Sequence, residues 1–332
     1  MKRLRAGVIG VGHLGQHHAR HYANLAGASL VGVFDTDPTR AKLIADRHGV
    51  QAYQQVKSLL KDVEIVSIAA PTSSHYSAAK VSLEAGKHVL VEKPIAVTPG
   101  EARELVELAG RQGCVLQVGH SERFNPIMQL MRPHIERPAF IECHRLSPFV
   151  ERGTDVDVVS DLMIHDLDLV LSFNPGAVEE VRAAGVTVLS PSIDIANARI
   201  AFASGCVANL TASRISTNKM RRLRVFQKEQ YVSIDFQTRQ AVVSRRVQGG
   251  GSKPSIEMEQ FKAGDEEPLR LELESFVQAV TTGCRPLVSG EDGEAALRLA
   301  HQVLEAIGAF IHRHSDGGLT AEAASETGAT YS

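Results

Sequence analysis

The chain of 332 residues is 43% hydrophobic and 22% charged, a composition typical of a folded protein of about two domains. Its 36 Lys and Arg residues almost balance its 38 Asp and Glu residues, so the net charge is −2. A near-neutral chain with no Trp and only 5% aromatic residues is unsuited to gripping nucleic acid or an anionic membrane, which excludes those classes.

Three features bear on the location of the protein. No apolar run approaches the ~20 residues of a membrane span. The first residues, 1–5, lead directly into an apolar segment, without the cleavage site of a signal peptide. The four cysteines lie far apart and form no CxxC pair: Cys114, Cys143, Cys206 and Cys284. We therefore expect free thiols, no metal site, no membrane partner and a cytoplasmic location.

The first part of the chain alternates short β-rich segments with helical patterns. The strands are predicted at 4–9, 28–34, 63–69, 88–91 and 114–118, and the helices at 13–26, 38–48, 75–85 and 99–112. Such alternation builds a parallel sheet with helices on both faces. We assign residues 1–122 to this domain.

Beyond residue 124 the pattern changes to strands without long helices between them. Strands are predicted at 139–146, 178–189, 193–202, 206–213, 223–226, 231–236 and 240–247, and helices at 126–135, 161–173, 269–282 and 291–313. This pattern indicates an α+β domain, 123–314, with a large, mainly antiparallel open sheet. Residues 248–254 read as a flexible loop and 315–332 as a disordered tail. The predicted fold class is α/β with this α+β domain appended.

A glycine motif stands between the first strand and the first helix. Gly10, Gly12 and Gly15 form GxGxxG, with His13 and Leu14 inside it. In this context the glycines allow a tight turn, close approach of a pyrophosphate and close helix packing, and the helix N-terminus attracts phosphate. The motif therefore predicts a dinucleotide site, the alternative being a glycine turn without a ligand.

Asp35 ends the second strand, twenty residues after Gly15. A carboxylate there accepts hydrogen bonds from the adenosine ribose of NAD and repels the 2′-phosphate of NADP. Arg40 is the counter-argument, because a guanidinium could reach that phosphate; otherwise it is a solvated helix residue. NAD is the predicted cofactor, ahead of NADP.

Two later motifs supply candidate catalytic groups. Lys93 lies in Glu-Lys-Pro directly after the strand at 88–91, and Asp161 and His165 lie four residues apart in Asp-Leu-Met-Ile-His-Asp-Leu-Asp. On a helix this spacing places both side chains on one face. The imidazole would take a proton from an alcohol and the ammonium would stabilise the alkoxide. Taken alone, each motif also fits a loop or a solvated helix face, and Asp166 and Asp168 read as solvent-side or packing residues.

Together, the order and spacing of these three motifs resemble those of the Gfo/Idh/MocA oxidoreductase family, up to about residue 313. The resemblance implies a Rossmann domain followed by a domain whose open sheet mediates oligomers, here a homodimer or homotetramer. It also implies hydride exchange between a nicotinamide cofactor and a sugar, polyol or sugar nucleotide. In these terms Lys93, Asp161 and His165 form the catalytic group, with His165 as the base.

The resemblance further implies which residues line the two ligands. Cofactor-lining positions are Pro71, Thr72, His75, Glu92, Lys93 and Gln117. Substrate-lining positions are Lys93, His120, Arg123, Asn125, Asp161 and His165. His75 reads equally well as a capping or surface residue, and Arg123 as a domain-bridging ion-pair partner.

The motif around His120 and the one around His165 are most similar to those of a subgroup acting on sugar nucleotides, the UDP-N-acetylglucosamine 3-dehydrogenases, which oxidise the C3 hydroxyl in cell-envelope amino-sugar synthesis. A diphosphate substrate needs cations, and one basic cluster is a candidate: Arg214, Lys219, Arg221, Arg222 and Arg224. Its alternative is a solvated sheet edge or subunit contact. Competing functions are an inositol or free-sugar dehydrogenase, an NAD-dependent glycosidase and a non-catalytic NAD-binding regulator.

Overall fold

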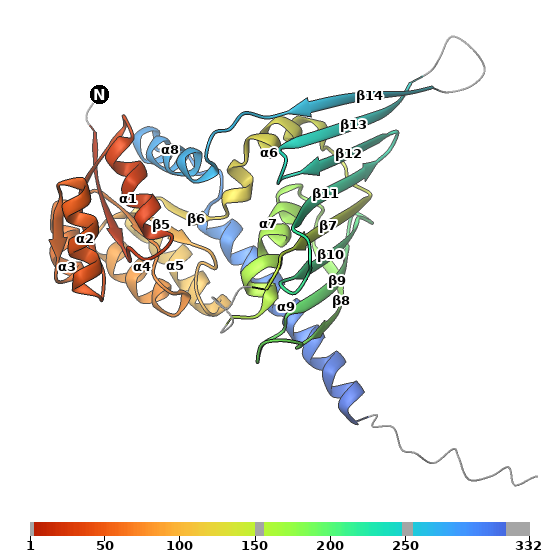
Figure 1. The fold of residues 1–332 in the computed structure, drawn as a ribbon, viewed down its shortest axis with the longest axis horizontal. Helices are drawn as coiled ribbons and strands as arrows, with labels where there is room; N and C mark the ends of the chain where they lie inside the picture. Colours follow the sequence, from red (N-terminus) through yellow and green to blue (C-terminus); the bar gives the residue numbers. More distant parts are fainter. Residues whose placement is uncertain (1–2, 150–155, 248–254, 317–332) are drawn as a thin grey trace, which may run out of the picture.

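The computed structural model describes residues 3–149, 156–247 and 255–316. Two sheets face each other across a layer of helices, as Figure 1 shows. The predicted loop at 248–254 and the predicted tail from 317 onward lie outside the described residues, whereas 315–316 still belong to the last helix.

The first sheet is entirely parallel, as predicted. Its strands are β1 (Leu4–Ile9), β2 (Ala28–Phe34), β3 (Gln51–Tyr53), β4 (Ile65–Ile68), β5 (His88–Glu92) and β6 (Leu116–Gly119). They lie in the order β3-β2-β1-β4-β5-β6, the doubly wound order whose carboxyl edge binds ligands. The helices of this half are α1 (Gly15–Asn24), α2 (Pro38–His48), α3 (Val56–Asp62), α4 (His75–Glu84) and α5 (Pro99–Gln112), with a 3₁₀ turn, η1 (Thr72–Ser74), before α4.

Local capping explains why two of these helices match their predicted bounds. The Asp37 side chain accepts hydrogen bonds from the first turn of α2, and Pro38 occupies the first helical position. Thr98 and Glu101 form a reciprocal capping box at the start of α5. Both signals are local in sequence, so they set a helix start without help from the rest of the fold.

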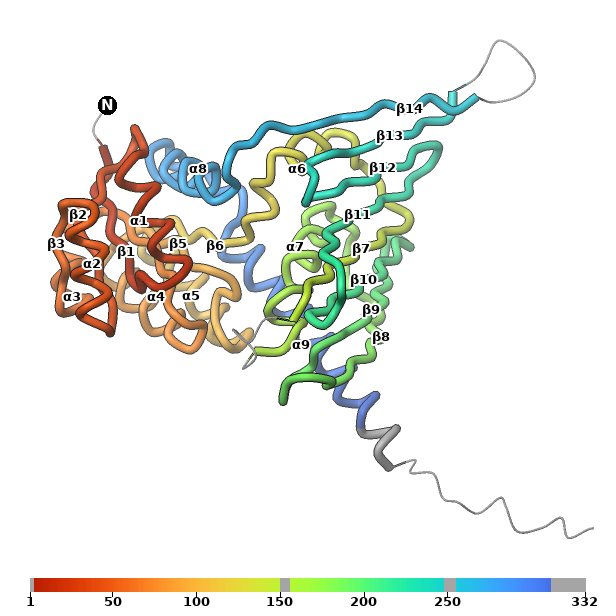
Figure 2. Tube along the Cα trace, viewed as in Figure 1, coloured from red at the N-terminus to blue at the C-terminus, as the bar shows by residue number. Residues whose placement is uncertain are grey.

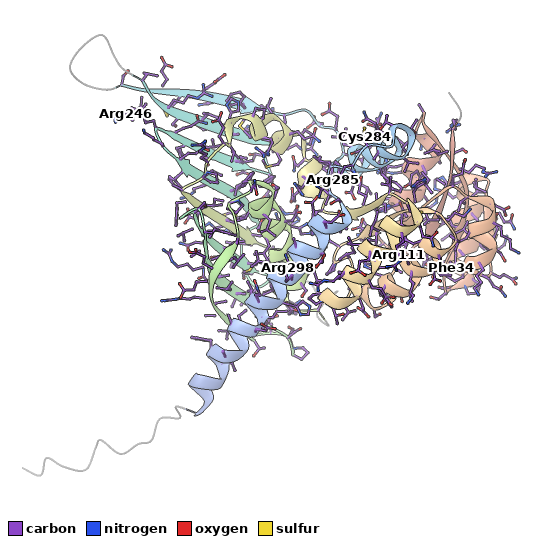
Figure 3. All side chains as sticks on the ribbon, turned by 180° about the vertical axis from the view of Figure 1, so that it is seen from behind. Phe34, Arg111, Arg246, Cys284, Arg285 and Arg298 are labelled. Carbon is purple, nitrogen blue, oxygen red and sulfur yellow. The ribbon has the colours of Figure 1, made fainter. Side chains whose placement is uncertain are left out.

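The second sheet is mixed and mostly antiparallel. Its strands are β7 (Phe140–Leu146), β8 (Val178–Val186), β9 (Ile195–Phe202), β10 (Val207–Ser213), β11 (Met220–Gln227), β12 (Gln230–Asp235), β13 (Gln240–Val247) and β14 (Ser255–Lys262). They lie in the order β14-β13-β12-β11-β7-β10-β9-β8, and β7 with β10 is the parallel pair among them. Figure 2 traces this sheet, and Figure 3 places Arg246 at the far end of the β13–β14 ribbon.

Helices cover the face of this sheet that looks toward the parallel sheet, and none of the described elements covers the other face (Figure 1). The covering elements are η2 (Ser121–Phe124), α6 (Pro126–Met131), η3 (Arg132–His134), a π-helical turn η4 (Val159–Met163), α7 (Ile164–Ser172) and α9 (Gly290–Asp316). Alternate strand residues on the covered face join one apolar core with α7 and α9.

The chain returns to the first half near its end. Helix α8 (Pro268–Thr282) was expected to close the second domain, but Leu273 and Phe276 pack in the same core as Val8 and Tyr22 of the parallel sheet and α1. The sequence displays the apolar stripe of this helix but not its partner. Within the described residues, no helix is long and apolar enough to cross a membrane.

Candidate active site

The glycine loop lies between β1 and α1, where the backbone is most crowded. Gly10 has φ +82°, and a Cβ atom there would lie 2.7 Å from the backbone nitrogen of Ala70. A Cβ atom at Gly15 would collide with the carbonyl oxygen of Gly10, whereas Gly12 faces open space. The first and third glycines are therefore needed for folding the loop, and the second leaves room for a ligand.

A groove of about 600 Å³ opens beside this loop. Gly10, Gly12 and His13 line it from one side, Asp35 and Arg40 from a second, and Ala70, Pro71 and Ser74 from a third; these come from the carboxyl ends of β1, β2 and β4. This is the edge at which doubly wound sheets bind their ligands. Leu14 is 40% exposed, and Thr72 opens η1 immediately after Pro71.

Asp35 organises the rim of the groove. Its Oδ2 accepts a hydrogen bond from Val11 N (2.8 Å) and its Oδ1 accepts one from Asp37 N (2.9 Å). Both oxygens also accept from Arg40 Nη1, at 3.3 Å for Oδ1 and 3.5 Å for Oδ2; these hydrogen bonds are long, so a ribose hydroxyl would displace them. Arg40 lies 3.3 Å from Asp35 and 3.4 Å from Asp37. Its charge is thereby balanced by two carboxylates, an arrangement suited to NAD and unfavourable to an added 2′-phosphate.

His75 is buried beneath the groove rather than lining it. Its Nδ1 lies 2.7 Å from the carbonyl oxygen of Pro94, and its Nε2 lies 2.8 Å from that of Ala70. The ring therefore connects the end of β4 to the segment that carries Lys93. The sequence left open whether His75 faces the nicotinamide or is a capping or surface residue. In the structure its buried ring instead links two backbone segments.

Lys93 and Asp161 lie where the two halves of the molecule meet, and the solvent-exposed region beside these two side chains and His165 is called the cleft. Lys93 Nζ donates hydrogen bonds to the Asp161 carbonyl oxygen (2.7 Å) and to Asp161 Oδ1 (3.0 Å). The Lys93 side chain is 18% exposed and that of Asp161 42%, so the pair lies at the cleft surface. This contact joins the carboxyl end of β5 to the turn before α7.

His165 lies in the first turn of α7. Its Nδ1 is buried without a hydrogen-bond partner among the described residues, and the ring as a whole is only partly buried, which leaves Nε2 as the nitrogen facing the cleft. Burial lowers the pKa of His165 well below 6.5, and the charge of Lys93 lowers it further. The imidazole is therefore neutral at pH 7, the form that accepts a proton.

The predicted helical pairing of Asp161 with His165 takes a different form. Asp161 belongs to the π-helical turn η4 and His165 to α7, so the two residues do not share one regular helix. A wider turn at this point is common at functional sites because it redirects a side chain. Lys93 is the group that Asp161 contacts directly.

His120 lies beside His165, with ring centroids 6.1 Å apart and the rings nearly perpendicular. It is 1% exposed, and neither ring nitrogen has a hydrogen-bond partner within the described part of the chain. Burial, reinforced by the charges of Arg123 and Lys93, lowers the pKa of His120 to about 3. Two neutral imidazoles therefore pack edge to face, with His165 at the cleft and His120 behind it.

Glu92 and Gln117 are less accessible than the sequence suggests. Glu92 Oε1 lies 2.9 Å from Nε2 of the buried His18 in α1. Gln117 is fully buried, and its Nε2 donates to the Glu272 carbonyl oxygen of α8 (3.1 Å). The structure thus turns Gln117 toward α8, whose backbone supplies its acceptor, and away from the groove.

Arg123 and Asn125, expected to line the substrate, serve contacts inside the protein. Arg123 Nε donates to Asp168 Oδ2 (3.0 Å), and its Nη2 lies 3.5 Å from Asp292 Oδ2. These contacts correspond to the domain-bridging ion pair, the alternative that the sequence offered for Arg123. Asn125 is buried, donates to Glu122 and accepts from Ile127 N as the cap of α6. Asp168 is buried as well, so it is not a solvent-side residue.

A buried charge network behind His165 was not predicted. Arg145 donates to both carboxylate oxygens of Asp166 (3.0 and 2.7 Å) and to Glu122 Oε1 (2.8 Å). Arg145 and Asp166 are 3% and 4% exposed, so Asp166 is not solvent-side either. A charged residue at an inward position of β7, after Ile141 and Cys143, is the sequence signal that could have revealed it.

The predicted basic cluster is divided by strand geometry. Arg214 is buried and its Nε donates to Asp194 Oδ1 (2.9 Å). Arg222 and Arg224 point to the uncovered face of the sheet, where they pair with Asp235 and Glu142. Arg221 points to the covered face. The prediction of a single cluster is wrong, because successive strand residues alternate between faces.

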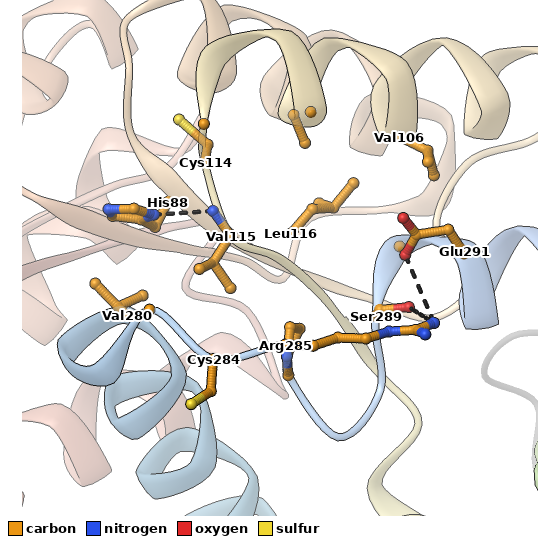
Figure 4. Close-up of a pocket in the computed structure, with 16 residues that line it drawn as sticks. His88, Val106, Cys114, Val115, Leu116, Val280, Cys284, Arg285, Ser289 and Glu291 are labelled. Carbon is orange, nitrogen blue, oxygen red and sulfur yellow. Dashed lines mark hydrogen bonds and ion pairs between the residues drawn. The ribbon is translucent and has the colours of Figure 1, made fainter.

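A second hollow, of about 440 Å³, lies at the other edge of the parallel sheet (Figure 4). Cys114 and Cys284 line it, and Arg285 Nη2 donates to Ser289 Oγ (2.8 Å). His88, at the amino end of β5, forms another part of its wall. Because it lies at the amino ends of the strands, it is separate from the cofactor groove.

Comparisons with known proteins agree with this site. Residues 4–120 match the model described as "Oxidoreductase family, NAD-binding Rossmann fold", and residues 132–232 match the "GFO/IDH/MocA C-terminal domain". The chain is 38% identical to the UDP-N-acetylglucosamine 3-dehydrogenase of Acidithiobacillus ferrooxidans over 94% of its own length and 100% of that protein.

A solved structure of that dehydrogenase superposes with a TM-score of 0.88, at 37% identity and the same coverage. The myo-inositol 2-dehydrogenase of Thermotoga maritima is 26% identical over 90% of this chain and 94% of that protein. Similarity therefore extends over both sheets and not only over the glycine motif.

Proposed function

This chain belongs to the Gfo/Idh/MocA family of NAD-binding oxidoreductases, and from that premise we propose that it oxidises a hydroxyl of a sugar nucleotide. UDP-N-acetylglucosamine is the proposed substrate and its C3 hydroxyl the proposed site, giving the 3-keto sugar for amino-sugar synthesis in the cell envelope. The observation that carries the proposal is the Lys93–Asp161 contact near His165, at the carboxyl edge of the parallel sheet that also holds the dinucleotide groove.

The identity of the relatives supports the substrate. The relative named for this reaction shares 38% of residues over its whole length, whereas the named myo-inositol 2-dehydrogenase shares 26%. Catalytic groups do not separate the two functions, since an inositol hydroxyl needs the same base. The preference rests on the higher identity.

The chemistry assigns one task to each group. The chemistry that the cofactor would supply, when bound, is acceptance of a hydride from the carbon that carries the hydroxyl. His165 Nε2 takes the hydroxyl proton, which its neutral form allows. The Lys93 ammonium stabilises the negative charge that develops on the oxygen, and Asp161 holds that ammonium in place through two acceptors.

The proposed ligand-contacting set is smaller than the sequence prediction. Cofactor contacts are proposed for Gly10, Gly12, His13, Leu14, Gly15, Asp35, Arg40, Pro71, Thr72 and Lys93, with Glu92 behind Lys93. Substrate contacts are proposed for Lys93, Asp161 and His165, with His120 packed behind His165. The groove and its edge supply the first set, and the cleft supplies the second. We further propose that residues 1–122 hold the cofactor and 123–314 the substrate.

The test is incubation of the purified protein with NAD and UDP-N-acetylglucosamine, followed by NADH absorbance. A coupled transaminase should be present to remove the ketone, because the equilibrium of the alcohol oxidation disfavours the ketone. Turnover of UDP-N-acetylglucosamine is expected, and the His165→Ala variant should bind NAD but not turn over. Turnover of myo-inositol or free aldoses alone would replace the proposal with the inositol reaction. Product release without net NADH would indicate a glycosidase, and NAD binding without any turnover would indicate a regulator.

We propose that the protein is a cytoplasmic homodimer or homotetramer assembled through the uncovered face of the second sheet. Phe226 on that face lies 5.7 Å from the ring of Phe140 and 4.8 Å from that of Tyr231. Ile256 and Met258 of β14 are 74% and 73% exposed. Analytical ultracentrifugation tests this, since Phe226→Glu should dissociate the oligomer and a monomeric wild-type protein would refute it.

A further inference from the structure

Arg221 stands apart from the other cations of the second sheet. It lies at the second position of β11, directly opposite Arg145 of β7 on the covered face. Like charges in directly opposed strand positions repel, so this pair requires nearby negative charge. Glu122 and Asp166 provide it, and Arg145 contacts both of them.

Arg145 lies closer to these carboxylates than Arg221 does. It reaches Asp166 at 2.7 Å and Glu122 Oε1 at 2.8 Å. Arg221 Nη1 lies 3.6 Å from that same Glu122 oxygen, which is too long for a hydrogen bond. Within the described ranges, the Arg221 guanidinium has no side-chain or backbone acceptor within 3.5 Å.

The head group of Arg221 is open to solvent. Its side chain is 48% exposed, whereas Glu122 is 8% and Arg145 4% exposed. A guanidinium carries five N–H donors in a planar fork that matches phosphate oxygens. Glu122 balances part of the Arg221 charge, and within the described ranges no acceptor lies within hydrogen-bond distance of the Arg221 N–H donors.

The direction of the fork follows from its neighbours. Glu122 lies in η2, directly after β6, and Asp166 follows His165 in α7. Arg221 also contributes a positive charge at His165, adding to the causes that lower the pKa of that residue. An anion bound at Arg221 would therefore lie on the same side of the second sheet as His165, where one substrate molecule would supply both the anion and the reacting hydroxyl.

We propose that Arg221 binds a phosphate group of the substrate and is the residue by which the cleft selects a sugar nucleotide over an uncharged polyol. This inference rests on the proposed function, because it names a contact for the diphosphate of that substrate. The competing explanation is that Arg221 serves only as a counter-ion for Glu122, without touching a ligand.

The experiment measures binding of UDP and of uridine to the NAD-saturated full-length protein by isothermal titration calorimetry. Arg221→Gln should weaken UDP binding at least tenfold, the loss expected for a charge-assisted hydrogen bond, and should leave uridine binding unchanged. Arg221→Lys, which keeps the charge but not the fork, should lie between. Arg222→Gln is the matched control, since the next residue faces the other side of the sheet.

The outcomes separate the two claims. Equal affinity of wild type and Arg221→Gln for UDP overturns the inference, and so does failure of the wild type to bind UDP. Equal weakening of UDP and uridine, with a lower melting temperature in both Arg221 variants, indicates the counter-ion role and also overturns it. If UDP binds in an Arg221-dependent way but no sugar nucleotide is oxidised, the phosphate contact stands and the proposed function fails.

Discussion

Lys93 Nζ lies 3.0 Å from Asp161 Oδ1, across 68 residues of sequence. The two partners come from different halves of the molecule, one after a strand of the parallel sheet and one from the turn before α7. This contact therefore exists only when both halves are folded together. It also connects the carboxyl edge of the parallel sheet to the turn before α7 by a pair of charges.

Replacing the members of this pair should affect turnover differently. Lys93→Met should lower kcat by about a thousandfold, since it removes the charge facing the alkoxide. Asp161→Asn should lower kcat by roughly ten- to a hundredfold, because the carbonyl contact to Lys93 remains. Steady-state kinetics and NAD titration check this, and unchanged NAD affinity is the control. Wild-type kcat in Lys93→Met would remove the lysine from the mechanism.

The pH dependence of kcat/KM reports the His165 base in the free enzyme. Because burial and then Lys93 lower the pKa of His165, the proton-accepting form persists below pH 6.5. The rate should therefore stay level from pH 8 down through 6.5, with the decline at more acidic pH. A kinetic pKa at or above 6.5 in the wild type would contradict the neutral, buried imidazole.

His75 should act through Lys93 and not on the substrate. His75→Ala removes the contacts to the Ala70 and Pro94 carbonyl oxygens, costing about 1–3 kcal/mol of unfolding free energy. It should lower kcat more than it raises KM. Tyr76→Phe is the control, since the Tyr76 hydroxyl contacts Glu104 of helix α5 (2.6 Å). A stable His75→Ala protein with normal kcat would show that the His75 contacts are not needed to position Lys93.

Glu272 should reduce stability at neutral pH. It is fully buried, and neither carboxylate oxygen has a partner among the described residues. Burial and then the charge of Glu92 raise its pKa well above the usual 4.5. The folded protein therefore keeps Glu272 protonated at pH values at which the unfolded chain has released that proton. The destabilising effect of Glu272 thus grows as pH rises above about 4.5.

Glu272→Gln should remove that effect. The melting temperature should rise by several degrees at pH 8 and by less at pH 5. The matched control is Glu274→Gln, two residues away, where only an exposed pair with Arg270 (2.9 Å) is lost. Calorimetry at both pH values measures the difference, and an equal shift at pH 5 and pH 8 would refute the buried proton.

Asp35 should determine cofactor affinity. Asp35→Asn removes the charge at the ribose end of the groove and should weaken NAD binding about ten- to a hundredfold. Asp46→Asn, which removes an exposed partner of Lys42 on the outer part of α2, is the control and should bind NAD normally. Calorimetric titration provides the affinities. Preserved NAD affinity in Asp35→Asn would place the ribose elsewhere.

Sequence reasoning succeeded where the signal is local. The glycine motif, the Asp37 and Thr98 caps and strand β13 at 240–247 match the structure because each depends on neighbouring residues. The second sheet was predicted from its run of strands, including its mainly antiparallel character.

It failed where partners are distant. The short edge strand β3 and the seven-residue α3 were missed because they are too short for a periodic pattern. Strand β14 was missed although Ile256 and Met258 alternate with Glu257 and Glu259 as in a strand. Asn125 is an exception, because its capping of α6 is local and the Asn-Pro pair at the start of that helix could have revealed it. Gln117 depends on the return of α8, 155 residues further along the chain. Tertiary packing decides such residues, and no local pattern records it.

Helix α9 has a mechanical consequence for the catalytic cycle. Its 27 residues span roughly 40 Å; Leu297 packs into the core of the parallel sheet, and Leu299, Val303 and Ile307 pack into the core of the other. Its start is also tied to β6 through Val118 N and the Val288 carbonyl oxygen (3.1 Å). One continuous helix thus crosses the seam, and a wide hinge opening would have to bend it or empty two cores. Ligand exchange should therefore proceed through movement of side chains and surface segments, with the distance between groove and base fixed when the chain folds.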